Sequence, residues 1–190
     1  IGIYSASLQG AEALWQFAKG ISTVQYSKVS NTKDRNEAID ISLKLGKLNY
    51  FVTGIGILFL LVIPASMYSS LFGAEFSEIK AHFIILAPGI FALSLSNALS
   101  HYFAGVGQHK FNTQSSVFGL LITIFIGYFL ILKTGTLGAA FTASIVYVSQ
   151  TIYQLIMLMR TTNVQLKELI LGKEDFKTII SIVKVKLGNG

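Results

Sequence analysis

Six polar residues near the start of the chain recur at helical spacing and are the best candidates for functional chemistry. Their separations of four, three, four, three and four residues place them on one face of an α-helix; they are Ser5, Gln9, Glu12, Gln16, Lys19 and Thr23. Glu12 and Lys19 are two turns apart, roughly 10 Å along the axis, too far for a direct ion pair. A carboxylate, an ammonium group and two amides on one face could bind a polar solute. We call this face the N-terminal stripe.

The residues between these polar positions are mostly apolar, which favours a membrane environment for the helix. An ionised group at membrane depth costs at least about 2.5–3.5 kcal/mol and almost always faces a protein interior or a water-filled cavity. Two alternatives stay open. In the first, Glu12 and Lys19 lie near the two membrane interfaces and extend to water. In the second, the helix lies on the membrane surface and does not cross it. A cavity-facing helix also explains Gln9 and Gln16, so we predict that these four residues line a translocation path.

Two weaker polar series occur later in the chain. They are Ser94, Asn97, His101, Gly105 and Gln108, and then Ser144, Tyr147, Thr151 and Gln154. Asn97, His101 and Tyr147 are possible cavity-lining residues, although hydrogen bonding between packed helices is the commoner role in membrane proteins. A series of small residues predicts close helix contact; it is Ser115, Gly119, Thr123 and Gly127.

No catalytic or metal-binding pattern accompanies these polar series. The sequence has no Gly-rich phosphate loop, no HExxH motif and no Gly-x-Ser-x-Gly motif. Cysteine is absent, and His82, His101 and His109 lack ligand spacing. We therefore expect no enzyme activity, no metal site and no cofactor.

The composition indicates a membrane protein. Hydrophobic residues make up 52% of the 190 residues and charged residues only 13%, against about 25% charged in an ordinary soluble domain. The net charge of +6 does not predict a nucleic-acid partner, because the basic residues do not form one patch.

The predicted fold is all-α, a polytopic membrane helix bundle with about five transmembrane helices and an amphipathic tail helix. We place the spans at residues 1–28, 48–68, 79–106, 112–132 and 137–159, within a transmembrane bundle of residues 1–160. Pro64 and Pro88 are predicted to kink two of the spans. Residues 161–190 form the cytoplasmic tail, whose apolar positions repeat at helical spacing; they are Phe176, Ile179, Ile180 and Val183. A linker to a further span is the alternative for the tail.

The basic residues predict the orientation of the chain. With five spans, twelve lie on one side of the membrane and two on the other, Lys80 and Lys133. Basic residues concentrate in cytoplasmic loops. We therefore predict that the chain starts outside and that its tail is cytoplasmic.

Several short segments, in this order, resemble a known family. They are Ile1-Gly-Ile-Tyr-Ser-Ala-Ser, Ala11-Glu-Ala-Leu-Trp, Ile21-Ser-Thr-Val, Ser69-Ser-Leu-Phe-Gly-Ala-Glu-Phe, Ile85-Leu-Ala-Pro-Gly, Tyr102-Phe-Ala-Gly-Val-Gly-Gln and Gly135-Thr-Leu-Gly-Ala-Ala. Their order and spacing over residues 1–160 resemble the second half of the polysaccharide flippases, the O-antigen and capsule exporters of the multidrug/oligosaccharidyl-lipid/polysaccharide superfamily. Members often have a proline just past the first helix, where this chain has Gln25-Tyr-Ser-Lys.

The resemblance implies a multi-pass protein of the bacterial cytoplasmic (inner) membrane that flips a lipid-linked oligosaccharide by alternating access. The implied partners are a polyprenyl-diphosphate-linked oligosaccharide, membrane lipid and the N-terminal half of the transporter. Lys19 would attract the diphosphate, and Glu12 would be a coupling or orienting carboxylate. Gln9 and Gln16 would hydrogen-bond sugar or phosphate oxygens.

Two other functions stay open. A cation-coupled drug antiporter of the same superfamily would require a deep carboxylate, for which Glu12 is the candidate. A membrane scaffold of a polysaccharide synthase would have no transport path, and the N-terminal stripe would then serve only in packing.

Overall fold

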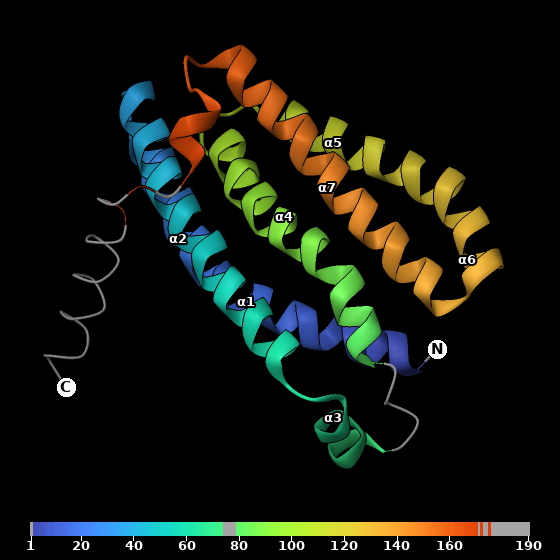
Figure 1. Ribbon diagram of the computed structural model, residues 1–190. Helices are drawn as coiled ribbons and strands as arrows, with labels where there is room; N and C mark the ends of the chain where they lie inside the picture. The colour runs from blue at the N-terminus through green and yellow to red at the C-terminus, as the bar shows by residue number, and fades with distance from the viewer. Residues whose placement is uncertain (1, 74–78, 171, 173–174, 176–190) are drawn as a thin grey trace, which may run out of the picture.

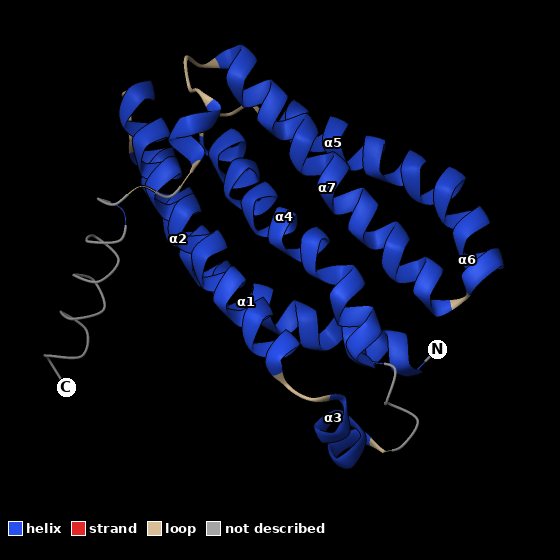
Figure 2. Ribbon diagram, in the orientation of Figure 1, coloured by secondary structure: helices blue, strands red, loops and turns tan. Residues whose placement is uncertain are grey.

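The computed structural model of the chain describes residues 2–73, 79–170, 172 and 175; the side chains of residues 2–4, 6, 7, 10–19, 71 and 72 lie outside this description. Within it the chain is built of helices and short connections, without a strand (Figure 2). The predicted all-α class is confirmed.

Seven α-helices make up the described bundle. They are α1 (Gly2–Asn31), α2 (Arg35–Val62), α3 (Ala65–Phe72), α4 (Ile79–Gly105), α5 (His109–Ile122), α6 (Tyr128–Thr134) and α7 (Thr136–Thr161). A π-helical turn, Thr123–Gly127, joins α5 directly to α6. In Figure 1, α4 lies between α2 and α7, and it contacts α1, α2, α5 and α7. The bundle is therefore organised around α4.

Four helical segments are long and apolar enough to cross a membrane. They are Arg35–Val62, Ile79–Gly105, His109–Thr134 and Thr136–Thr161. The chain is therefore a multi-pass membrane protein. Helix α1 is 30 residues long but is not one of these four, so a fifth crossing stays a prediction.

The predicted start of the second span is wrong by more than three helical turns. We placed it at residue 48, but α2 begins at Arg35, so only residues 32–34 separate it from α1. The side chain of Asp34 caps the helix by accepting a hydrogen bond of 2.9 Å from the Asn36 backbone N–H. Hydropathy missed this first half because it is polar, while packing of Ala38 and Gly46 stabilises it.

The same span also ends earlier than predicted. Helix α2 stops at Val62, and Pro64 caps the separate short helix α3 rather than kinking a continuous one. Pro88, in contrast, lies inside α4 as predicted. Among the described residues after α7, Leu166–Leu169 form a 3₁₀ turn. The predicted apolar positions of the tail helix, from Phe176 onward, lie outside the described residues.

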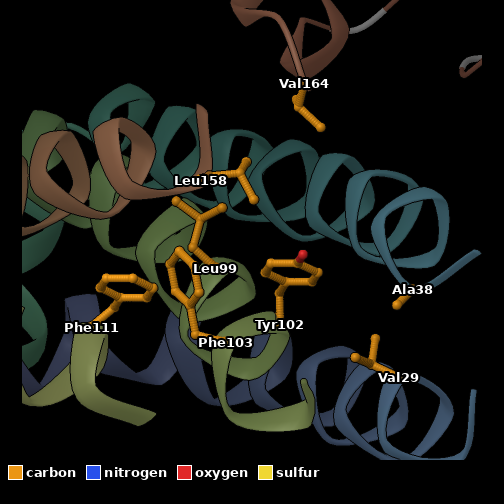
Figure 3. Close-up of a cluster of buried hydrophobic side chains, with 8 residues drawn as sticks. All are labelled: Val29, Ala38, Leu99, Tyr102, Phe103, Phe111, Leu158 and Val164. Atoms are coloured by element: carbon orange, nitrogen blue, oxygen red, sulfur yellow. The ribbon is translucent and has the colours of Figure 1, made fainter. Parts of the chain in front are cut away.

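A cluster of buried hydrophobic side chains joins five helices, α1, α2, α4, α5 and α7, and the segment after α7. Figure 3 shows Leu99, Phe103 and Phe111 packed against one another, with Tyr102 alongside. The rings of Phe103 and Phe111 are 5.1 Å apart, centre to centre. Val29, Ala38, Leu158 and Val164 complete the cluster.

Helices α4 and α7 approach so closely at Gly89 that no side chain fits there. An added Cβ would lie 2.5 Å from the Ser144 Cα, which is backbone and cannot rotate away. We predict that Gly89→Ala destabilises the protein by about 1–3 kcal/mol, the usual effect of overpacking, measured by thermal unfolding in detergent. Gly20→Ala is the control, since nothing lies within 4 Å of its Cβ; it should leave the melting temperature unchanged or raise it. Equal effects of the two changes would contradict this packing.

Candidate functional site on the polar faces of the bundle

The described members of the N-terminal stripe are exposed. Ser5, Gln9 and Thr23 are all on the open side of α1, whereas Ser22, Gln25 and Val29 are buried. At 100° per residue, these two sets lie on well-separated faces of one helix. Ser5, Gln9 and Thr23 therefore face away from the buried side of α1. The backbone of Glu12, Gln16 and Lys19 belongs to α1, but their side chains lie outside the described part.

The inner face of α1 meets α2 and α4 through polar contacts, which we call the α1–α2–α4 seam. Gln25 Nε2 donates to the Ala98 carbonyl at 2.7 Å. Asn49 Nδ2 donates to the Ser94 carbonyl at 3.1 Å and to Ser22 Oγ at 3.3 Å. These contacts fix the rotation of α1, and so they also fix the direction of Ser5, Gln9 and Thr23.

Sequence reasoning missed Gln25 and Asn49. Gln25 lies three residues after Ser22 and four before Val29, so the three share one helix face. That spacing was the available signal for a buried polar contact face.

A second polar interface, the α4–α5–α7 seam, centres on Gln154, which is only 2% exposed. Ser96 Oγ donates to Gln154 Oε1 at 2.6 Å, and Gln154 Nε2 donates to Ser100 Oγ at 2.7 Å. Asn112 Nδ2 in turn donates to the Ser100 carbonyl at 2.9 Å. These polar groups join helices, the role that we expected for Gln154.

The ridge of small residues on α5 also packs as predicted. Ser115, Gly119 and Gly127 are buried. An added Cβ at Gly119 would overlap Gln150, and one at Gly127 would lie 3.0 Å from Thr142. Thr123 is exposed and instead bonds the Gly119 carbonyl at 2.9 Å.

The possible cavity-lining residues are all partly buried. His101 packs edge-on against Tyr26, with ring centres 6.2 Å apart. Asn97 and Tyr147 lie on α4 and α7. None of the three lines either of the two apolar pockets described next, and a cavity role for them stays a prediction.

Two apolar pockets meet at Tyr50. The first lies at the α2–α4 contact and is a small cavity of ≈ 20 Å³, lined by Ser42, Lys47 and Tyr102 together with aliphatic side chains. The second is an open groove of ≈ 400 Å³ between α2 and α4; its lining includes Gly54, Leu58 and Phe91. The groove has the shape and polarity of a surface that lipid covers.

Basic residues mark one end of the bundle, where α1, α4 and α7 end and α2 and α5 begin (Figure 1). Lys28, Arg35, Lys110 and Arg160 lie in the terminal turns at this basic end. Lys80 and Lys133 lie near the opposite end.

The chain after α7 folds back over this basic end. We call its described residues, 162–170 with 172 and 175, the strap. Arg35 donates to the Thr161 carbonyl at 2.7 Å, just before the strap. The Tyr50 hydroxyl donates to the Leu169 carbonyl at 2.6 Å. Lys47 Nζ and Asp175 Oδ2 form a partly buried salt bridge of 2.8 Å.

Within the described part of the chain, no three His, Asp or Glu side chains gather closely enough to hold a metal ion. Compared with known proteins, the chain matches no family model, no curated protein and no solved structure.

Gln154 is predicted to be a main polar determinant of stability. Gln154→Leu would leave Ser96 and Ser100 hydroxyls without their partner in a buried site, which costs about 1–3 kcal/mol per orphaned group. Thermal unfolding should therefore shift to lower temperature. Gln114→Leu on the exposed side of α5 is the control and should have a much smaller effect. A mild effect of Gln154→Leu would refute the importance of this network.

The salt bridge of the strap predicts a dependence on pH. The hydrogen bond from Lys47 lowers the pKa of Asp175 below its usual 3.8, and burial only partly offsets this. A lowered pKa in the folded state gives stability that is complete above the ordinary pKa and is lost as the pH falls through the lowered one. Hydrogen exchange of the amides of residues 164–170 should therefore speed up, relative to its intrinsic rate, as the pH falls below about 4. Asp175→Asn should remove this change; if it persists, another group is responsible.

Proposed function

We propose that this chain is part of a membrane transporter of the polysaccharide-flippase family, which moves a lipid-linked oligosaccharide across a membrane by alternating access. The order of the short motifs over residues 1–160 supports the family. The all-α, multi-pass architecture is compatible with it. The proposal depends most on one structural observation, the direction of the N-terminal stripe.

Helix α1 presents Ser5, Gln9 and Thr23 on the side turned away from α2 and α4. Polar side chains within a membrane are expensive to expose to lipid and ordinarily face protein or water. The exposure of Ser5 and Gln9 therefore favours a polar neighbour on that side of α1. A hydrated path shared with the N-terminal half of a transporter would be such a neighbour.

The residue types of the stripe suit the proposed substrate. An ammonium group at Lys19 would attract the diphosphate of a polyprenyl carrier through charge-assisted hydrogen bonds. Amides at Gln9 and Gln16 offer both donors and acceptors to sugar hydroxyls. Glu12 would orient the substrate or couple its movement to an ion.

The basic end of the bundle supports an orientation. Since Lys and Arg concentrate on the cytoplasmic side of membrane proteins, we place the ends of α1, α4 and α7 there. The chain would then start outside, with its tail in the cytoplasm. The membrane would be the bacterial cytoplasmic (inner) membrane, where lipid-linked oligosaccharides are flipped.

Lys19→Ala in the full-length transporter tests the proposal. Loss of a charged hydrogen bond should lower export of surface polysaccharide roughly tenfold or more, measured by sugar-specific labelling of intact cells. Lipid-linked precursor should accumulate at the same time. Lys28→Ala is the matched control, because Lys28 is an exposed lysine of α1 outside the stripe.

Two outcomes would contradict the flippase. Normal polysaccharide export after Lys19→Ala, with loss of an ion-driven export after Glu12→Gln, would identify an antiporter. Normal export in both variants would favour a scaffold, in which the stripe only packs against another protein.

A further inference from the structure

Buried polar atoms without a hydrogen-bond partner concentrate where α1, α2 and α4 meet. Of the six such atoms among the described residues, four lie on this seam: Gln25 Oε1, Ser42 Oγ, Asn49 Oδ1 and the Tyr102 hydroxyl; the other two are Asn97 Nδ2 and Gln108 Oε1. Gln25, Asn49 and Tyr102 are at most 1% exposed. An unsatisfied buried polar group costs about 1–3 kcal/mol, so native proteins supply partners, which include internal water.

The α4–α5–α7 seam differs in this respect. Both amide atoms of Gln154 are paired, with Ser96 and Ser100. Thr151 Oγ1 donates to the Ala92 carbonyl at 2.9 Å, and Ser115 Oγ to the Gln150 carbonyl at 3.4 Å. These described groups need no water, and parting α7 from α4 would break direct bonds.

The α2–α4 part of this seam also has room for water. Ser42 and Tyr102 line the same cavity of ≈ 20 Å³, whose other walls are mainly aliphatic and include Leu158 of α7 and Leu169 of the strap. One water molecule requires about 10–15 Å³ and two to four polar partners. The two unpaired hydroxyls provide two of these partners, and Lys47 lines the cavity beside them.

We propose that the α1–α2–α4 seam binds internal water, with one molecule held between the Ser42 and Tyr102 hydroxyls, and that this hydrated seam is the one that opens. Because water molecules exchange their hydrogen bonds readily, separating α1 and α2 from α4 requires less free energy than separating α7 from α4. This inference rests on the bundle alone and does not depend on the transported substrate.

The sign of one mutational effect tests whether water is present. Tyr102→Phe removes only the hydroxyl. If that hydroxyl bonds water, the melting temperature should fall by roughly 2–4 °C. If the hydroxyl is dry and unpaired, removing it should leave the melting temperature unchanged or raise it, which would overturn the proposal. Tyr68→Phe is the positive control, because the Tyr68 hydroxyl donates to the Leu60 carbonyl at 2.8 Å and its loss must lower the melting temperature.

A labelling experiment tests whether this seam opens. The chain has no cysteine, so a single introduced thiol is a unique reporter. Ser22→Cys and Ser115→Cys are matched, since these serines are 1% and 3% exposed and lie on the two different seams. In full-length protein in membranes, a water-soluble methanethiosulfonate should label Ser22→Cys at least roughly tenfold faster, a difference of about 1.4 kcal/mol in opening.

The comparison is biased against the proposal, which strengthens a positive result. Ser115 lies six residues from the start of α5, whereas Ser22 lies nine residues from the end of α1; Ser115 is therefore nearer the basic end of the bundle. Equal labelling rates, or faster labelling of Ser115→Cys, would show that the α1–α2–α4 seam is not the one that opens.

Discussion

Close contact of helices with α4 is the constraint on which the rest of the structure depends. Lipid provides no hydrophobic force between membrane helices, so they are held by close packing and by hydrogen bonds. Gly89 admits the backbone of α7, and Gly105 admits Val29 of α1. On α2, Gly46 lies against Ala98. These contacts bring the polar groups of each pair of helices within bonding distance.

The two seams on either side of α4 use their polar groups differently. Around Gln154 the groups satisfy one another, which makes α4, α5 and α7 a rigid unit. Around Gln25 and Asn49 they leave acceptors unpaired, which gives a softer interface beside the helix that bears the N-terminal stripe. The proposed transport would use both properties, because a rigid unit transmits a movement that a softer interface permits.

The strap connects these units at the basic end. Its backbone bonds Tyr50 of α2, while Val164 packs into the hydrophobic cluster of Leu99 and Leu158. The salt bridge of Lys47 with Asp175 adds a charged link to α2. Movement of α2 against α7 therefore has to accommodate the strap, which limits its range.

The sequence by itself determined the fold class, three of the four apolar spans to within a few residues, and the helical face on which Gln9 lies. Apolar runs and helical spacing are local properties of the sequence, and a bilayer stabilises helices that have them. The start of α2 at Arg35 escaped this reasoning because a polar half-helix is stabilised by packing and by its cap at Asp34, not by hydropathy.

Only the tertiary structure decided which polar groups form hydrogen bonds with one another. Spacing placed Gln154 on a helix face, but its partners Ser96 and Ser100 lie more than fifty residues away. The sequence likewise gave no sign that the Ser42 and Tyr102 hydroxyls border one cavity. Such pairings depend on how closely and at what rotation helices meet, which is set by glycine contacts between distant segments and not by the local pattern of either helix.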